Sequence, residues 1–244
     1  MTKYKIVLQY VGSRYSGWQI QKGVETIQGN LCAALQTLTG ETTSVIGSGR
    51  TDAGVHALHQ VGHFVLSKKI SREKLLRGLN GILPWDIQIT RIQYVDLGFH
   101  AQQNAWKKRY QYRIYNGRGL SPFWHGYAYH LRSPLDLQAM QESAEQLAGW
   151  HDFCGFTATA SKVKDFRRQI FLSNFTRRGR HILYRIEANG FLHHMVRNIT
   201  GTLMEIGLNQ RPISDIKKIL KCKDRRIAGR TAPAHGLYLV KVWY

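Results

Sequence analysis

The chain is short of acidic residues. Of its 244 residues only 15 are Asp or Glu, against 35 Lys or Arg, which gives a formal net charge of +20. An excess this large is unusual for an enzyme of small neutral substrates, and it indicates a polyanionic partner. The basic residues occur as short clusters along the whole chain. We therefore expect a groove built from several elements rather than a disordered basic arm.

Cysteines and long apolar runs are also scarce. Cys32, Cys154 and Cys222 are widely spaced and form no C-x-x-C pair, so neither a disulfide framework nor a zinc site is expected. No apolar run approaches the length of a membrane span, and the first residues lack the apolar region of a signal peptide. These absences predict a cytoplasmic protein without a membrane partner. The sequence also contains neither a Rossmann fingerprint nor a P-loop.

The stretch 47–60, G-S-G-R-T-D-A-G-V-H-A-L-H-Q, combines glycines with an arginine and a carboxylate. Glycines let the backbone approach a ligand closely and adopt positive φ. Arg50 and Asp52 are two residues apart, so their side chains leave an extended segment on the same side. The flanking residues 42–47 and 61–66 have strand-like sequences. We therefore interpret the stretch as a loop at a strand end, where rigid scaffolds commonly carry their chemistry.

Hydrophobic patterns in the first half predict alternating strands and helices. Residues 3–11 and 86–95 are expected to be further strands. A helix is expected over residues 26–39, with Thr26 as its N-cap and Gly40 at its end. A second helix is capped by Ser71, and its core-facing residues are expected to be Leu75, Leu76, Leu79 and Ile82.

The second half opens with a strand over residues 107–115. Its alternation places Tyr110 and Tyr112 on one face, and the segment offers both aromatic and basic side chains to a nucleic acid. Residues 157–167 are small, polar and basic, and we interpret them as an RNA-facing loop. Residues 117–134 are expected to form a loop or a partner surface. The other expected elements are a helix over 135–148, a hairpin of 168–177 and 181–188, a helical apolar stripe over 192–203, a helix opened by Pro212 and a C-terminal strand.

Four of these stretches resemble the pseudouridine synthases, most closely the TruA family that modifies tRNA. They are G-R-T-D-A-G-V-H-A, R-Y-x-Y, G-F-L-H-H-M-V-R-N and T-A-P-A-x-G-L-x-L. The resemblance implies that Asp52 is the catalytic carboxylate and that Tyr110 stacks on the target base with Tyr112 behind it. It also implies that Arg197 pairs with the catalytic aspartate. Sequences of this family usually carry F-x-A-R before the tyrosine motif, but Gln102 stands at the arginine position here, which puts one expected phosphate contact in doubt.

The same resemblance implies an α+β fold of two similar α/β-sandwich halves, joined through a mostly antiparallel sheet with a central basic cleft. We expect the halves to be residues 1–100, with the aspartate loop, and residues 101–244, with the tyrosine and arginine motifs. The implied substrate is tRNA, at uridines of the anticodon stem-loop around positions 38–40, and the implied assembly is a homodimer. No DNA partner is expected.

The reaction itself sets further expectations. Conversion of uridine to pseudouridine breaks the base–ribose N–C bond, turns the base and forms a C–C bond, without redox change, so no cofactor is expected. It needs one carboxylate, as nucleophile or base, in a dry pocket. A uridine stacked in a stem must first be flipped out, at a cost of a few kcal/mol. Arg50, beside Asp52, is suited to hold the displaced backbone or to fill the gap that the base leaves.

Two other functions are open to the same residues. An RNA-binding or RNA-folding protein could use the same basic groove without chemistry. A metal-dependent nuclease could use His56, His59 and His63, but no nearby carboxylate other than Asp52 completes a ligand set. We therefore expect no metal site and interpret these histidines as structural or RNA-contacting.

Overall fold

The computed structural model describes residues 1–158 and 163–244, and they form two compact units. The first unit is Met1–Trp106 with Tyr238–Tyr244, and the second is Lys107–Leu237. The division expected from sequence lay between residues 100 and 101 and assigned the C-terminal strand to the second half. The expected RNA-facing loop over 157–167 lies partly outside the described residues.

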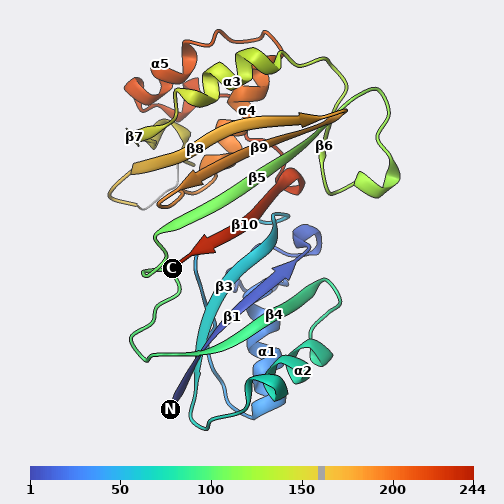
Figure 1. Ribbon diagram of the computed structural model, residues 1–244, viewed down its shortest axis with the longest axis vertical. Helices are drawn as coiled ribbons and strands as arrows, with labels where there is room; N and C mark the ends of the chain where they lie inside the picture. Colours follow the sequence, from blue (N-terminus) through green and yellow to red (C-terminus); the bar gives the residue numbers. More distant parts are fainter. Residues whose placement is uncertain (159–162) are drawn as a thin grey trace. The chain divides into compact units, whose positions relative to one another are not determined.

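The first unit contains a mostly antiparallel sheet with two helices on one face (Figure 1). The strand order is β4-β1-β3-β10, in which β1 is antiparallel to both β3 and β4, and β10 is parallel to β3. A short strand, β2, pairs with β3. The bounds are β1 Thr2–Tyr10, β2 Ile46–Gly47, β3 His56–Leu66, β4 Ile87–Val95, β10 Leu237–Trp243, α1 Ile27–Thr39 and α2 Arg72–Ile82.

Local capping explains where the first-unit helices begin and end. The Thr26 side chain accepts a hydrogen bond from the Gly29 amide at 3.2 Å, and Gly40 ends α1 with a φ of 74°. Ser71 caps α2 in the same way.

Three details of the prediction for the first unit were wrong. The strand predicted over 42–47 is limited to β2, β3 begins at His56 inside the predicted loop, and Ile82 is 41% exposed rather than in the core.

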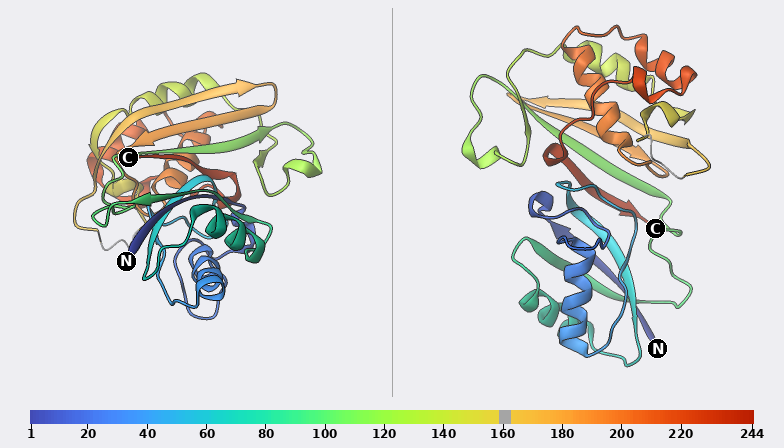
Figure 2. Two further views of the ribbon diagram at one scale, coloured as in Figure 1. Left: turned by 60° about the horizontal axis from the view of Figure 1, so that its bottom comes forward. Right: turned by 180° about the vertical axis from the view of Figure 1, so that it is seen from behind.

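The second unit is also built on a mostly antiparallel sheet, in the order β5-β9-β8-β7. The short strand β6 pairs in parallel with β5, inside the segment predicted as a loop. Helices α3 and α4 lie on one face of this sheet (Figure 2). The bounds are β5 Lys107–Asn116, β6 Tyr129–Leu131, β7 Gly149–Asp152, β8 Arg167–Arg178, β9 His181–Ala188, α3 Leu137–Glu145, α4 Met195–Gly207 and α5 Asp215–Cys222.

The predicted α+β class and mostly antiparallel pairing are therefore confirmed. The alternation read from residues 107–115 is also borne out, because Tyr110, Tyr112 and Ile114 are all buried. The stripe on α4 is buried as well, with Met195, Val196, Ile199 and Leu203 in the core. Among the described residues, no helix is both long and apolar enough to cross a membrane.

Candidate active site

Asp52 lies on the loop between β2 and β3, and the backbone on both sides of it is fixed by hydrogen bonds. The Thr51 carbonyl accepts from the Trp18 amide at 3.1 Å, and the Asp52 carbonyl accepts from the Val55 amide at 3.2 Å. The hydroxyls of Tyr10 and Thr51 lie 2.8 Å apart in a buried contact. Asp52 itself is half-buried, on a loop that these hydrogen bonds hold in place.

A buried pair of polar side chains ties the start of this loop to β3. The Ser48 hydroxyl donates to Oε1 of Gln60 at 2.7 Å, and the side-chain nitrogen Nε2 of Gln60 donates to the Gly49 carbonyl at 3.0 Å. The Ser48 amide also donates to the Val61 carbonyl at 2.7 Å. Ser48 and Gln60 are both fully buried. Sequence reasoning missed this pair, although both residues lie at the edges of the 47–60 stretch.

Two glycines outside the loop allow other backbone to approach it. A Cβ on Gly12 would overlap the carbonyl oxygen of Val55, and Gly17, with a φ of 87°, leaves no room for a Cβ beside the Thr51 carbonyl. Gly12 begins the 3₁₀ turn Gly12–Arg14, which therefore packs against the aspartate loop backbone to backbone. A larger residue at either position would displace the loop.

Burial keeps the tyrosine that supports the loop uncharged. Desolvation raises the pKa of Tyr10 to about 12, although hydrogen bonds from Thr51 and Gln60 oppose the shift. At neutral pH the Tyr10 hydroxyl is thus a neutral hydrogen-bonding group. Arg50, the other predicted residue of this loop, is exposed to solvent.

Two of the three histidines named above, His56 and His63, accept hydrogen bonds from backbone amides. Nδ1 of His56 accepts from the Gly12 amide at 3.1 Å, and its ring stacks on Tyr238 with centroids 4.6 Å apart. Nδ1 of His63 accepts from the Ala101 amide, also at 3.1 Å. Burial, together with the neighbouring His100 and Lys3, lowers the pKa of His63 to about 4.

In the second unit, β5 carries the two predicted tyrosines. Tyr110 is 8% exposed, and its ring meets Phe191 edge to face with centroids 5.1 Å apart. Tyr112 is fully buried, and its hydroxyl donates to the Pro233 carbonyl at 2.8 Å. Burial raises the pKa of Tyr112 strongly, so its hydroxyl remains protonated. The contact with Phe191 holds the Tyr110 ring. Tyr112, the next residue on the same face of β5, is fixed behind it by its bond to Pro233.

Arg197 lies in the first turn of α4, and its guanidinium is oriented by a neighbouring segment. Nε of Arg197 donates to the Ala232 carbonyl at 2.8 Å, and the Ala232 amide donates back to the Arg197 carbonyl at 3.0 Å. Arg197 is half-buried. The bond from Nε fixes the plane of the guanidinium, whose planar fork of N–H donors matches the geometry of a carboxylate or a phosphate.

A polar network that the sequence did not predict supports this segment. Asn198 is fully buried, and its Oδ1 accepts from the Thr231 hydroxyl at 2.7 Å and from the Arg225 guanidinium at 3.0 Å. Arg225 also donates to the Thr231 hydroxyl at 3.1 Å. The network joins α4 to residues 228–232, which run alongside it. Its members are distant in sequence. The one available sign of the network was the asparagine that follows Arg197 in G-F-L-H-H-M-V-R-N.

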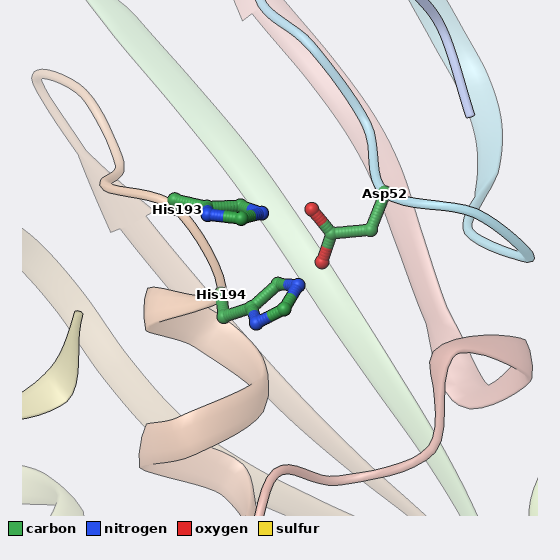
Figure 3. Close-up of side chains that lie close together, drawn as sticks. All are labelled: Asp52, His193 and His194. Atoms are coloured by element: carbon green, nitrogen blue, oxygen red, sulfur yellow. The ribbon is translucent and has the colours of Figure 1, made fainter. Parts of the chain in front are cut away.

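Two histidines directly before α4 were given no role by the sequence analysis. The rings of His193 and His194 are in contact, with centroids 4.0 Å apart. His194 adopts a left-handed backbone conformation, with a φ of 61°, which is uncommon for a residue with a side chain. Figure 3 draws these rings at the start of α4, and Asp52 on its own loop. In the sequence, the available sign of this pair was the two adjacent histidines of G-F-L-H-H-M-V-R-N.

A protein-family model covers Asp52, Arg50 and Arg197, whereas Tyr110 lies between its two matched stretches. The family model described as tRNA pseudouridine synthase matches residues 6–103 and 143–244, which is most of the chain. The chain belongs to the tRNA pseudouridine synthase family. It is accordingly an isomerase that acts on tRNA, as the resemblance had implied.

Individual relatives extend over the full length. The chain is 43% identical to the tRNA pseudouridine synthase A of Limosilactobacillus reuteri, over 100% of this chain and 97% of that protein. It is 41% identical to the tRNA pseudouridine synthase A of Acetivibrio thermocellus, over 100% of both chains. A tRNA pseudouridine synthase A 2 of Bacillus anthracis is 40% identical over 99% of each.

Proposed function

We propose that Asp52 is the catalytic carboxylate of this tRNA pseudouridine synthase. In the reaction the N1–C1′ bond of uridine breaks, a C5–C1′ bond forms, and the proton that leaves C5 is replaced by one at N1. A single carboxylate can serve as the nucleophile or base for this exchange. The observation that carries the proposal is the support of the Asp52 loop: hydrogen bonds fix the backbone on both sides of a half-buried carboxylate.

Arg197 and Tyr110 are proposed as its partners at the substrate. An arginine whose Nε is already engaged offers its remaining donors in one fixed direction, which suits pairing with a carboxylate. Tyr110, supported edge to face by Phe191, offers a fixed aromatic ring on which an extruded base can stack. Stacking of this kind contributes roughly 1–3 kcal/mol per base.

The target uridine is proposed to be flipped out of the anticodon stem-loop, around positions 38–40. The exposed Arg50, two residues from Asp52, would hold the displaced backbone. The large positive charge supports a polyanionic substrate gripped over an extended surface. We further propose that the enzyme works as a homodimer in the cytoplasm.

Substitution of Asp52 tests the proposal most directly. Asp52→Asn keeps the size and polarity of the side chain but removes the carboxylate. The variant should bind tRNA within a few-fold of wild type and form no pseudouridine, measured as loss of tritium from C5-tritiated uridine in tRNA. Asp96→Asn is the matched control, because Asp96 is an exposed carboxylate of the same unit. Pseudouridine formation by Asp52→Asn at the control rate would refute the catalytic role.

The roles of Arg197 and Tyr110 can be distinguished by the activity and tRNA binding of their variants. Arg197→Ala should remove activity with only a modest loss of tRNA binding, whereas Tyr110→Phe should retain the ring and therefore most of the activity. An Arg197→Ala variant with near-normal turnover would contradict the pairing with Asp52. An inactive Tyr110→Phe variant would assign a role to the hydroxyl and not to the ring.

A further inference from the structure

Five arginines gather at one end of the second-unit sheet, and we call them the arginine edge. They are Arg118, Arg132, Arg177, Arg178 and Arg180. Strand register brings their segments together: His181 lies opposite both Arg178 on β8 and Tyr115 on β5, and Asn116 lies opposite Leu131 on β6. Figure 1 shows the β8–β9 hairpin and the segment between β5 and β6 at this same end.

The arginine edge carries positive charge that its surroundings do not neutralise. All five side chains are exposed. The sequence contains no Asp or Glu in residues 97–135 or 166–186, the two stretches that form the edge. Within the part of the chain that the structure describes, none of the five forms an ion pair with a carboxylate. Like charges held close together repel one another, and a bound anion relieves that repulsion.

The backbone under the edge is firmly held. The Asn116 side chain donates to the carbonyls of Leu131 at 3.0 Å and Ser133 at 2.7 Å. The Asn116 amide donates to the Arg180 carbonyl at 2.8 Å. The Trp124 ring packs on His181 with centroids 4.6 Å apart. The arginines therefore project from a fixed frame, which lowers the entropy lost when they bind a ligand.

The arginine edge lies well away from Tyr110 along β5. Neighbouring strands lie about 4.8 Å apart, so the row from β8 across β9 and β5 to β6 extends roughly 14 Å. Along β5, Tyr115 lies about 17 Å from Tyr110, at roughly 3.4 Å per residue. A flipped nucleotide stacked on Tyr110 does not reach that far, so the edge is left for another part of the same tRNA.

We propose that the arginine edge binds the phosphate backbone of a paired stem of the same tRNA, away from the target uridine. A second copy of the chain is the less favourable occupant, because a symmetric contact would set the same positive surfaces against each other. Phe123 on the same segment is 89% exposed and is the kind of side chain that anchors a protein partner, so the test must also measure the association state. This proposal rests on the proposed function in one respect: it takes the target uridine to lie in the anticodon stem-loop.

The test compares two triple variants that remove the same charge. The edge variant is Arg118→Gln, Arg132→Gln and Arg178→Gln, which are exposed and have no hydrogen bond to a described carboxylate. The control is Lys217→Gln, Lys218→Gln and Lys221→Gln, which are exposed on α5 of the same unit. A third variant, Arg→Lys at the three edge positions, retains the charge. Dissociation constants are measured over a salt series for full-length tRNA and for an isolated anticodon stem-loop.

For full-length tRNA the edge variant should bind about tenfold more weakly, and the log–log salt slope should fall by about 2 to 3, at roughly 0.7–0.9 per lost phosphate contact. The α5 control and the Arg→Lys variant should stay within about twofold of wild type. The isolated stem-loop should bind all variants alike. Failure of the proposed function would appear separately, as pseudouridine formation by Asp52→Asn.

Three outcomes would overturn the proposal. Equal weakening by the edge and α5 variants would mean that only total charge matters. Full weakening on the isolated stem-loop would place the contact at the target loop and not on a distant stem. A change from dimer to monomer in sedimentation, for the edge variant alone, would identify the edge as a contact between copies of the chain.

Discussion

The loop that carries Asp52 and the segment that orients Arg197 are supported by different chemistry. In the first unit the supporting side chains named above are neutral: the hydroxyl of Tyr10 and the Ser48–Gln60 pair. In the second unit they are charged. Arg225 binds Asn198 and Thr231, and the Glu205 carboxylate accepts from the Arg230 amide at 2.9 Å and from Arg211 at 2.5 Å.

The difference follows from what each segment presents. Under the proposed function the cation that pairs with Asp52 is Arg197, and neutral groups orient the aspartate loop without supplying a second cation. The segment beside α4 has to hold several guanidinium groups close together, and the carboxylates of Glu205 and Asp215 offset their repulsion. Substitutions that act on one support and spare the other can test this contrast.

The largest effect is expected where each support depends on backbone contact. A Cβ on Gly12 would overlap the Val55 carbonyl, and a Cβ on Gly201 of α4 would overlap the Arg230 carbonyl. Backbone cannot move aside as a flexible side chain can, so Gly12→Ala and Gly201→Ala should each lower the free energy of unfolding by about 3 kcal/mol. Urea denaturation measures the change.

Gly81→Ala is the control for these two variants. Gly81 lies in α2, and no atom would lie within 4 Å of its Cβ. There the substitution should stabilise by about 0.5–1 kcal/mol, because alanine loses less conformational freedom in a helix. Urea midpoints for Gly12→Ala and Gly201→Ala that match wild type would show that the two segments are not in the close contact described.

The second effect concerns the charged support. Arg225→Met removes the guanidinium that binds Asn198 and Thr231, and a hydrogen bond to a charged group contributes about 2 kcal/mol. We expect that loss of stability together with a lower kcat and an unchanged KM, since Arg197 would lose its fixed direction. Arg226→Met is the control, because the Arg226 side chain is 90% exposed and, among the described residues, pairs with Asp224 two positions before it. Equal kinetics in the two variants would remove Arg225 from the site.

Sequence reasoning predicted local features of the fold, but neither of these two supports. The ends of α1 were predicted because Thr26 and Gly40 act on residues beside them in the chain. The strand β5 was predicted because its alternation is local, and the family motifs led to Asp52, Tyr110 and Arg197 as candidates. Patterns of this kind depend on near neighbours, which the sequence displays directly.

Contacts between distant segments were missed. Gly12 and Val55 touch through backbone atoms, and neither residue type signals the other. The bond from Arg225 to Asn198 joins residues on separate elements, so it carries no periodicity. The first residues of β3 were read as loop because the glycines before them dominate the local pattern, whereas pairing of His56 with Tyr238 of β10 makes them strand.

The neutral support should show a smaller effect. Tyr10→Phe removes the hydroxyl that contacts Thr51 and should cost about 1 kcal/mol of stability. Tyr184→Phe is a matched control, because the Tyr184 hydroxyl is equally buried and lies 2.8 Å from the Ser173 hydroxyl on the neighbouring strand. Both variants should lose similar stability, but only Tyr10→Phe should lower kcat, since only its partner adjoins Asp52. Loss of kcat in Tyr184→Phe to the same extent would mean that kcat follows global stability.

The last effect is the contribution of His63, in the first unit, to the pH dependence of stability. The pKa of His63 is lowered to about 4 in the folded protein, from about 6.5 in the unfolded chain. Between these values the unfolded chain binds more protons, so stability rises with pH across this window and is lost as pH falls from about 6.5 towards 4. His63→Asn should therefore weaken the dependence of the urea midpoint on pH between 7 and 5. The exposed His125 of the second unit provides the control as His125→Asn, which should retain the wild-type dependence. An identical pH dependence in His63→Asn and wild type would assign the acid sensitivity to other groups.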